Sequence, residues 1–264
     1  MSRPATGHVD RVRLRVVDVD DDDLLPRWRP GGFFFQRDGE GIVASGAAVP
    51  ITVPPSPHQV ADAAARVTEA LAAVEAESGA APVVVGALPF DGGQPATLIV
   101  PRVAIVRRGG RTTALVAEDA ALPEPHTDLL PPPGIVSTVA EPPRREYVAA
   151  VRKARDAIRA GALDKVVLAR TLMLCFERAP DVRSLLAWLR AADPHAYTYA
   201  FGEMIGATPE LLVERRGEIV RAEPLAGSAR RGRDDDDDAA AAEALLQSGK
   251  DHAEHTYVVD AIRA

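Results

Sequence analysis

Lys165 is a candidate catalytic residue, because its side-chain type and its position in the sequence suit a general base. It stands at the head of an apolar run, residues 166–168, which we expect to lie in a buried strand. The chain has three lysines, so 28 of its 31 basic residues are arginines. Arginine stays protonated in proteins, whereas a desolvated lysine can lose its proton and act as a general base. The alternative is a lysine whose stem lies along a strand end with its ammonium in water.

Glu210 is a candidate proton donor. It follows a turn-rich segment, residues 206–209, and precedes the apolar residues 211–213. A carboxyl group beside a buried strand can be desolvated enough to stay protonated, so Glu210 could act as a general acid. The alternative is a solvated glutamate at the start of a strand.

Asp251 and Glu254 form a candidate metal site. Their spacing of three residues places both carboxylates on one face of a helix. Mg²⁺ commonly takes one or two protein carboxylates together with water and substrate oxygens. The alternatives are two solvated acids, or a zinc site at the neighbouring His252 and His255, which would need further ligands.

A loop over residues 224–228 is the last candidate. Gly227 would let a backbone N–H approach an anionic ligand closely, with Ser228 beside it. The alternative is an ordinary turn.

Two blocks of secondary structure must position these side chains. In the first, alternating apolar and charged residues predict a strand over 11–16, and residues 33–35 and 42–44 predict a hairpin with its turn at 38–41. Apolar spacing favours a helix over 60–77, and strands are expected over 83–85 and 97–106.

The second block begins with a predicted helix over 146–160 that ends at Gly161. A strand over 165–169 is expected directly after it. We then expect a helix around 185–189, strands over 197–206, 211–213 and 218–221, and helical structure from Ala239 onward. The prolines at 123, 125 and 131–133 break regular structure and indicate an exposed connection over 118–143. The predicted organisation is a β-rich region over 1–117, a Pro-rich connection over 118–143 and a catalytic region over 144–264.

Composition excludes several classes of protein. The 264 residues are 47% hydrophobic and carry a net charge of −7, which is typical of a folded globular chain. The acidic balance, without a basic stripe, argues against nucleic-acid binding. No apolar run approaches the ~18–20 residues that span a bilayer. The first ten residues lack the apolar stretch of a secretory signal, so we expect no membrane association and a cytoplasmic protein.

Two other features are interpreted structurally. Cys175 lies in an apolar run and is expected to be a small buried hydrophobic residue. The acidic runs 20–23 and 234–238 are expected to be solvated surface, because consecutive aspartates in an extended loop cannot all converge on one ion.

The four candidate motifs follow one another in an order that resembles a known enzyme family. The sequence reads GALDKVVLAR over 161–170, GATPELL over 206–212, PLAGSARR over 224–231 and KDHAEH over 250–255. Together these four motifs resemble the chorismate-utilising enzymes, and among them the isochorismate synthases. Residues 86–91 and 100–102 are similar to the family's less regular N-terminal region, so the resemblance covers most of the chain.

The resemblance implies a fold and a set of roles. The fold would be α+β and two-lobed, with mainly antiparallel sheets and helices packed outside. Lys165 would activate water for attack at C2 of chorismate, and Glu210 would protonate the departing C4 hydroxyl. Mg²⁺ would bind at Asp251 and Glu254, with Glu254 the more direct ligand, while Gly227 and Ser228 would contact the substrate. The protein would be a monomer at full length, with chorismate as its small-molecule partner, and would supply menaquinone or siderophore biosynthesis.

Few residues separate the subfamilies. Anthranilate synthases typically carry glutamine at the position of Lys165, so a lysine favours water addition. Salicylate synthases keep the lysine but usually have Gly-Thr where this chain has Gly227 and Ser228. We therefore expect an isochorismate synthase, with a salicylate synthase as the alternative enzyme.

Length sets a further expectation. Family members are considerably longer, and their C-terminal part supplies another Mg²⁺ ligand and groups that hold the substrate. We therefore expect an incomplete catalytic region with at most weak activity. The non-enzyme alternative is an inactive fragment whose final helix exposes apolar surface.

Overall fold

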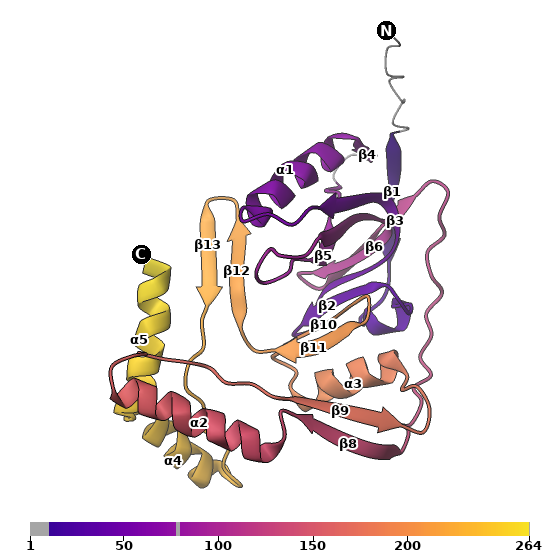
Figure 1. Cartoon of the computed structure of the whole chain (residues 1–264). Helices are drawn as coiled ribbons and strands as arrows, with labels where there is room; N and C mark the ends of the chain where they lie inside the picture. The colour runs from indigo at the N-terminus through magenta and orange to yellow at the C-terminus, as the bar shows by residue number, and fades with distance from the viewer. Residues whose placement is uncertain (1–10, 78–79, 264) are drawn as a thin grey trace. The chain divides into compact units, whose positions relative to one another are not determined.

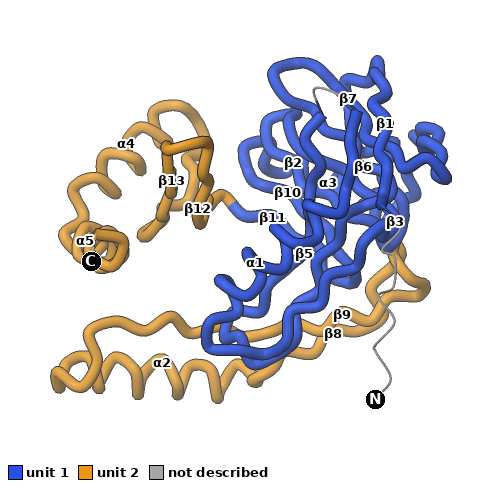
Figure 2. Tube along the Cα trace, turned by 90° about the horizontal axis from the view of Figure 1, so that it is seen from above, with its two compact units in different colours: residues 1–132, 181–208 blue, residues 133–180, 209–264 orange. Residues whose placement is uncertain are grey.

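The computed structural model describes residues 11–77 and 80–263. The chain forms two compact units, one made of residues 1–132 and 181–208 and the other of residues 133–180 and 209–264 (Figures 1 and 2). These units differ from the predicted regions, because residues 181–208 return to the first unit. The first ten residues, for which the sequence predicts no secretory signal, lie outside the described residues.

A nine-stranded sheet forms the first unit. Its order is β11-β10-β2-β3-β6-β7-β1-β4, with β5 paired to β6, and all pairs except β1–β4 are antiparallel. The strands are β1 (Val12–Val19), β2 (Phe33–Arg37), β3 (Glu40–Val53), β4 (Val74–Ala76), β5 (Val85–Ala87), β6 (Ala96–Arg108), β7 (Arg111–Ala117), β10 (Tyr197–Phe201) and β11 (Met204–Thr208).

Local sequence signals place several of these elements correctly. The predicted hairpin is β2–β3, and its turn contains Asp38 and Gly39, both with positive φ. The predicted helix over 60–77 is α1 (Gln59–Ala72), and it ends early because the chain turns into β4.

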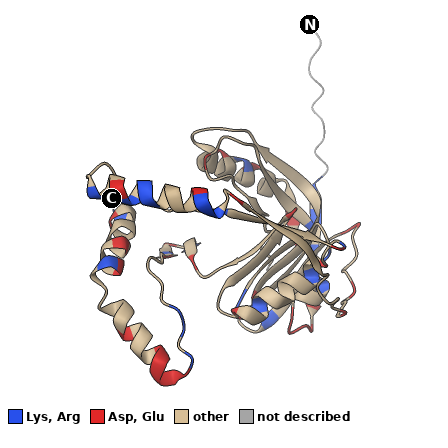
Figure 3. Cartoon of the chain, turned by 60° about the horizontal axis from the view of Figure 1, so that its bottom comes forward, with Lys and Arg blue, Asp and Glu red and all other residues tan. Residues whose placement is uncertain are grey.

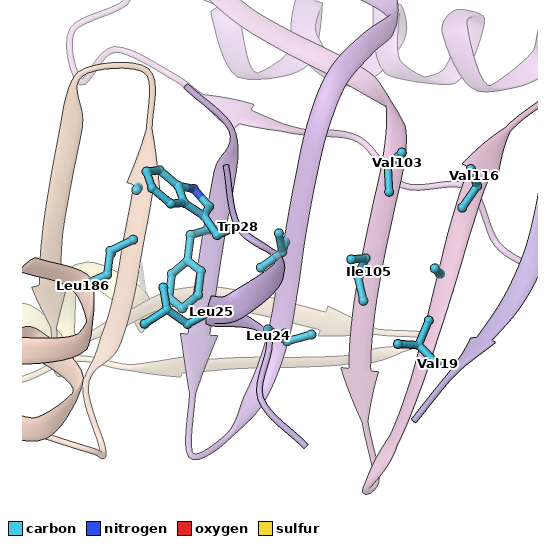
Figure 4. Packing of buried hydrophobic residues seen from close by; sticks show 12 residues of the cluster. Val19, Leu24, Leu25, Trp28, Val103, Ile105, Val116 and Leu186 are labelled. Atoms are coloured by element: carbon cyan, nitrogen blue, oxygen red, sulfur yellow. The ribbon is translucent and has the colours of Figure 1, made fainter. Parts of the chain in front are cut away.

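The main hydrophobic cluster lies between the sheet and two helical segments, η1 (Leu25–Arg27) and α3 (Val182–Ala192) (Figure 4). Phe34, Leu24 and Leu186 are fully buried there. Trp28 is also buried, and its indole Nε1 donates to the Gly32 carbonyl at 3.2 Å. A second cluster packs α1 against the first half of β6 and the end of β3.

Residues 118–132 are mostly exposed but are tied to the first unit. The His126 amide donates to the Pro26 carbonyl at 2.8 Å, and the Leu130 amide donates to Ser184 Oγ at 2.8 Å. The Pro-rich segment therefore runs along η1 and α3. The acidic run 20–23 is also at the surface, but Asp21 pairs with Arg27 and Asp23 with Arg190, each at 2.7 Å.

In its described residues, the second unit contains two antiparallel strand pairs and three helices. Its elements are α2 (Arg144–Arg159), α4 (Asp235–Leu246), α5 (Gly249–Arg263) and the antiparallel pairs β8 (Ile135–Glu141) with β9 (Thr171–Phe176), and β12 (Leu211–Arg216) with β13 (Ile219–Glu223). Among the described residues, every buried hydrophobic side chain belongs to the first unit. The architecture is α+β with mainly antiparallel sheets, as predicted.

Two predictions in this unit are wrong. Residues 165–169 are irregular, and the strand begins only at Thr171, where the backbone pairs with β8. Cys175 is exposed rather than buried. It lies in a two-stranded sheet whose β9 side chains are almost all exposed, so its apolar neighbours do not enclose it.

The second acidic run begins a helix. Asp234 is the N-cap of α4, since its carboxylate accepts from the Asp237 amide at 2.9 Å, and four aspartates occupy the first turn (red helix end in Figure 3). Carboxylates are favourable beside the free N–H groups of a helix start. The helix therefore begins before Ala239, and the run is helical rather than an extended loop. None of the helices in the described part of the chain has the length and apolar character needed to cross a bilayer.

Candidate active site

All six predicted site residues lie in the second unit, on four separate segments. They are Lys165, Glu210, Gly227, Ser228, Asp251 and Glu254.

The segment that carries Lys165 is fixed by the end of α2. The Ala162 amide donates to the Ala157 carbonyl at 2.9 Å, and Gly161 has a φ of 70°. This is the glycine-terminated helix end that the sequence predicts. Further along, the Tyr147 hydroxyl donates to the Leu168 carbonyl at 3.2 Å, which ties the segment to α2.

Lys165 itself is half-buried. Within the described part of the chain, its amine takes part in no hydrogen bond or ion pair. The described contacts therefore join Lys165 to none of the other five residues.

Glu210 lies at one end of the β12–β13 hairpin. It is exposed and directly precedes Leu211, which pairs with Glu223 across the hairpin. Because the loop over 224–228 begins directly after Glu223, the hairpin holds Glu210 and the start of this loop at the same end.

Gly227 meets helix α5. A Cβ atom added to Gly227 would lie 2.9 Å from the Asp251 Cβ and 3.0 Å from its Oδ1, and Gly227 has a φ of 86°. A side chain at this position would be strained and would collide with the Asp251 side chain. The structure thus brings together two motifs that are separate in the sequence, and the need for glycine here is steric.

The carboxylates of Asp251 and Glu254 share a half-buried face of α5. Asp251 is in the first turn, where its amide donates to Ser248 Oγ at 3.3 Å. His252 and His255 are exposed, and His252 Nε2 lies 2.5 Å from the Leu246 carbonyl oxygen.

Lys250 is a functional candidate to which the sequence analysis assigned no role. Its Nζ lies 2.9 Å from Glu254 Oε1 and 3.7 Å from Asp251 Oδ1. The hydrogen bond to Glu254, followed by attraction to both carboxylates, raises the pKa of Lys250. The spacing of four residues between Lys250 and Glu254 is a sequence signal for this pair.

The donor set suits Mg²⁺ better than zinc. Asp251 and Glu254 supply hard oxygen ligands, and the Lys250 ammonium shows that positive charge is favourable between them. Over residues 11–77 and 80–263, no group of three or more His, Cys, Asp or Glu side chains converges as a metal site. One or two carboxylates are sufficient for Mg²⁺, whereas a protein zinc site takes three or four ligands.

The chain is similar in sequence to a known enzyme family and to curated proteins. A family described as "Chorismate binding enzyme" matches residues 28–264. Isochorismate synthase DhbC of Bacillus subtilis is 32% identical over 260 residues, which cover 94% of this chain and 63% of that protein. Isochorismate synthase EntC of Escherichia coli is 33% identical over 261 residues, covering 89% of this chain and 60% of that protein.

A solved structure has a similar fold. It is MenF, the menaquinone-specific isochorismate synthase from Escherichia coli, with a TM-score of 0.75 at 24% identity over 94% of this chain and 62% of that chain. The chain spans 63% and 60% of the length of the two curated relatives, DhbC and EntC.

Proposed function

The chain belongs to the chorismate-binding enzyme family, and on that premise we propose that the protein is an isochorismate synthase. The reaction is the conversion of chorismate to isochorismate, in which water adds at C2 and the C4 hydroxyl leaves. The observation that carries the proposal is the close approach of Gly227 to Asp251, because it brings the loop that we propose for the substrate beside the helix that we propose for Mg²⁺. The similarity to two curated isochorismate synthases supports it.

The proposed chemistry uses one base and one acid from this chain. The Lys165 amine takes a proton from water as the water oxygen bonds to C2. Glu210 gives its proton to the C4 hydroxyl, which leaves as water while both ring double bonds shift by one position. One water enters and one leaves, and both side chains then exchange protons with solvent. Each group contributes ~10²–10⁴-fold to the rate.

We propose Asp251 and Glu254 as the residues that hold Mg²⁺, with Glu254 the more direct ligand. When bound, the ion supplies positive charge that neutralises a substrate carboxylate. The Gly227 amide contacts the same anion, because no Cβ stands in the way. Ser228, which is exposed beside it, completes the loop that receives the substrate.

A product assay tests the proposal. The protein is incubated with chorismate and Mg²⁺, and the products are separated by chromatography. Isochorismate alone is expected. Salicylate with pyruvate would instead assign the salicylate synthase reaction, and unchanged chorismate would contradict both.

Lys165→Arg tests the general base directly. Arginine keeps the positive charge but cannot be deprotonated, so kcat should fall by about 10²–10⁴-fold. Lys153→Arg, at an exposed position on α2, is the matched control and should leave kcat unchanged. If Lys165→Arg kept wild-type kcat, Lys165 would not be the base.

A further inference from the structure

The first unit contains a cavity of about 470 Å³ between η1, the end of β2, α3 and residues 126–129. None of the six predicted site residues lines it. Its rim includes the exposed His126 and Leu129, whereas Gln36 and Arg183 in its wall are only 3% and 7% exposed. The cavity is therefore reachable from solvent and has buried polar groups inside.

Arg183 is a buried cation without an ion-pair partner. Its Nη2 donates to the Trp28 carbonyl at 3.0 Å, but its Nε has no hydrogen-bond partner. Among the described residues, no carboxylate lies within ion-pair distance of Arg183. The nearby Asp181 carboxylate attracts the Arg183 charge, but its hydrogen bonds come from the Ser184 amide and hydroxyl and from the backbone of Arg183. A buried charge is costly unless it is paired directly, so the Arg183 guanidinium has room for an anion as a direct partner.

Other arginines lie near Arg183. The pKa of Arg29 is lowered, first by burial and then by the neighbouring charges of Arg183 and Arg27, while the charge of Glu124 opposes the shift. The two other cations that line the cavity have acidic neighbours, Arg37 with Asp38 and Arg190 with Asp23. Of the three arginines that line the cavity, Arg183 is therefore the one with no ion pair to a described carboxylate.

Gln36 supplies the complementary polar group. It lies on β2, and its side-chain Oε1 has no hydrogen-bond partner although the residue is almost completely buried. Buried amide oxygens are nearly always hydrogen-bonded. The cavity thus presents an unused donor on Arg183 and an unused acceptor on Gln36, between apolar walls from Leu25, Ala187 and Ala196.

We propose that this cavity binds a small monocarboxylic acid that has an apolar body and a hydrogen-bond donor. Its carboxylate pairs with the Arg183 guanidinium, and its hydroxyl or amine donates to Gln36. The site is separate from the isochorismate synthase proposal, because it uses no residue of that reaction.

Calorimetric titration of the full chain tests the site, with 3-hydroxybenzoate as the probe. Saturable binding with one site per chain is expected. Benzoate lacks the donor and 3-hydroxybenzamide lacks the charge, so both should bind at least about tenfold more weakly, as expected for the loss of a hydrogen bond to a charged or buried group. Tighter binding of inorganic phosphate than of 3-hydroxybenzoate would overturn the assignment to a carboxylic acid.

Two variants assign the contacts. Arg183→Gln should abolish binding of 3-hydroxybenzoate, whereas Arg66→Gln, an exposed arginine on α1, should not change it. Gln36→Leu should reduce the affinity for 3-hydroxybenzoate to that for benzoate and leave the affinity for benzoate unchanged. Unaltered binding by either cavity variant would overturn the proposal.

Thermal unfolding separates a binding role from a structural one. Without ligand, Arg183→Gln should keep or raise the Tm, because it removes an uncompensated buried charge. With the probe, the Tm of the wild type should rise and that of Arg183→Gln should not. A lower ligand-free Tm for Arg183→Gln, without any effect of the probe on the wild type, would make Arg183 a structural residue.

Discussion

At the scale of single residues, Lys250 gains a role from the structure. Its ammonium sits beside the two carboxylates that we propose for Mg²⁺, and the pKa of Lys250 is raised chiefly by its hydrogen bond to Glu254. A bound cation and this ammonium would compete for the same negative charge. We therefore expect Lys250 to compensate the charge of the carboxylates in the absence of metal and to oppose Mg²⁺ binding.

Lys250→Gln tests this competition. Removing the ammonium should tighten Mg²⁺ binding by up to about fivefold, which is the scale of an exposed ion pair. Calorimetric titration with MgCl₂ measures the Kd, and Lys153→Gln on α2 is the control. An unchanged or weaker affinity in Lys250→Gln would contradict the competition.

At the scale of elements, helix α3 depends on its first turn. The Asp181 carboxylate accepts from the Ser184 amide at 2.9 Å and caps the helix. Burial opposes ionisation of Asp181, but the hydrogen bonds from Ser184, together with the charge and the backbone amide of Arg183, outweigh it, so the pKa of Asp181 lies below its ordinary value of 3.8. The same helix supplies Leu186 to the core and Arg183 to the cavity, so its cap supports both.

Asp181→Ala should lower the free energy of unfolding by about 1 kcal/mol, the usual cost of losing an N-cap. Asp181→Asn should be nearly neutral at pH 7, since asparagine caps as well as aspartate. Urea unfolding over a range of pH measures both effects.

The two variants also differ in their pH dependence. A carboxylate whose pKa is lower in the folded state stabilises the fold above its unfolded pKa of about 3.8, and this contribution is lost as the pH falls through the folded value. Wild-type stability should therefore fall more steeply than that of Asp181→Asn below about pH 4. Parallel profiles for the two proteins would rule out the capping carboxylate as a source of this dependence.

At the scale of the whole molecule, the two units differ in how they bury apolar surface. The three hydrophobic clusters all belong to the first unit, on a nine-stranded sheet. The second unit has two separate two-stranded sheets, and large apolar side chains such as Val167 and Leu212 are more than 80% exposed. Isolated two-stranded sheets are marginally stable in water, so stability should be unevenly distributed.

Hydrogen exchange followed by mass spectrometry measures this distribution. Amides of β3, β6 and β7 should exchange slowest, with an opening free energy close to that of global unfolding. Amides of β8, β9, β12 and β13 should exchange on the order of a hundredfold faster or more, because few packed side chains stabilise the pairing of these strands. Equal protection in both sets would show that the second unit has a core of comparable stability.

The sequence by itself determined the local elements and the kinds of chemistry available. The turn at Asp38 and Gly39, the end of α2 at Gly161 and the shared face of Asp251 and Glu254 follow from contacts between residues near in the chain. Such contacts depend on backbone geometry that a few neighbouring residues fix. The order of four motifs also indicated the family.

Tertiary structure decided the features that depend on residues far apart in the chain. Residues 165–169 do not form the expected strand. The apolar residues in this segment could not predict this, because hydrophobicity does not show whether a neighbouring strand is present to pair with. The approach of Gly227 to Asp251, and the unpartnered atoms of Arg183 and Gln36 in one cavity, have no local signature. The burial of side chains and the pairing of strands are properties of the folded chain. Only the three-dimensional structure therefore shows which buried polar groups have no hydrogen-bond partner.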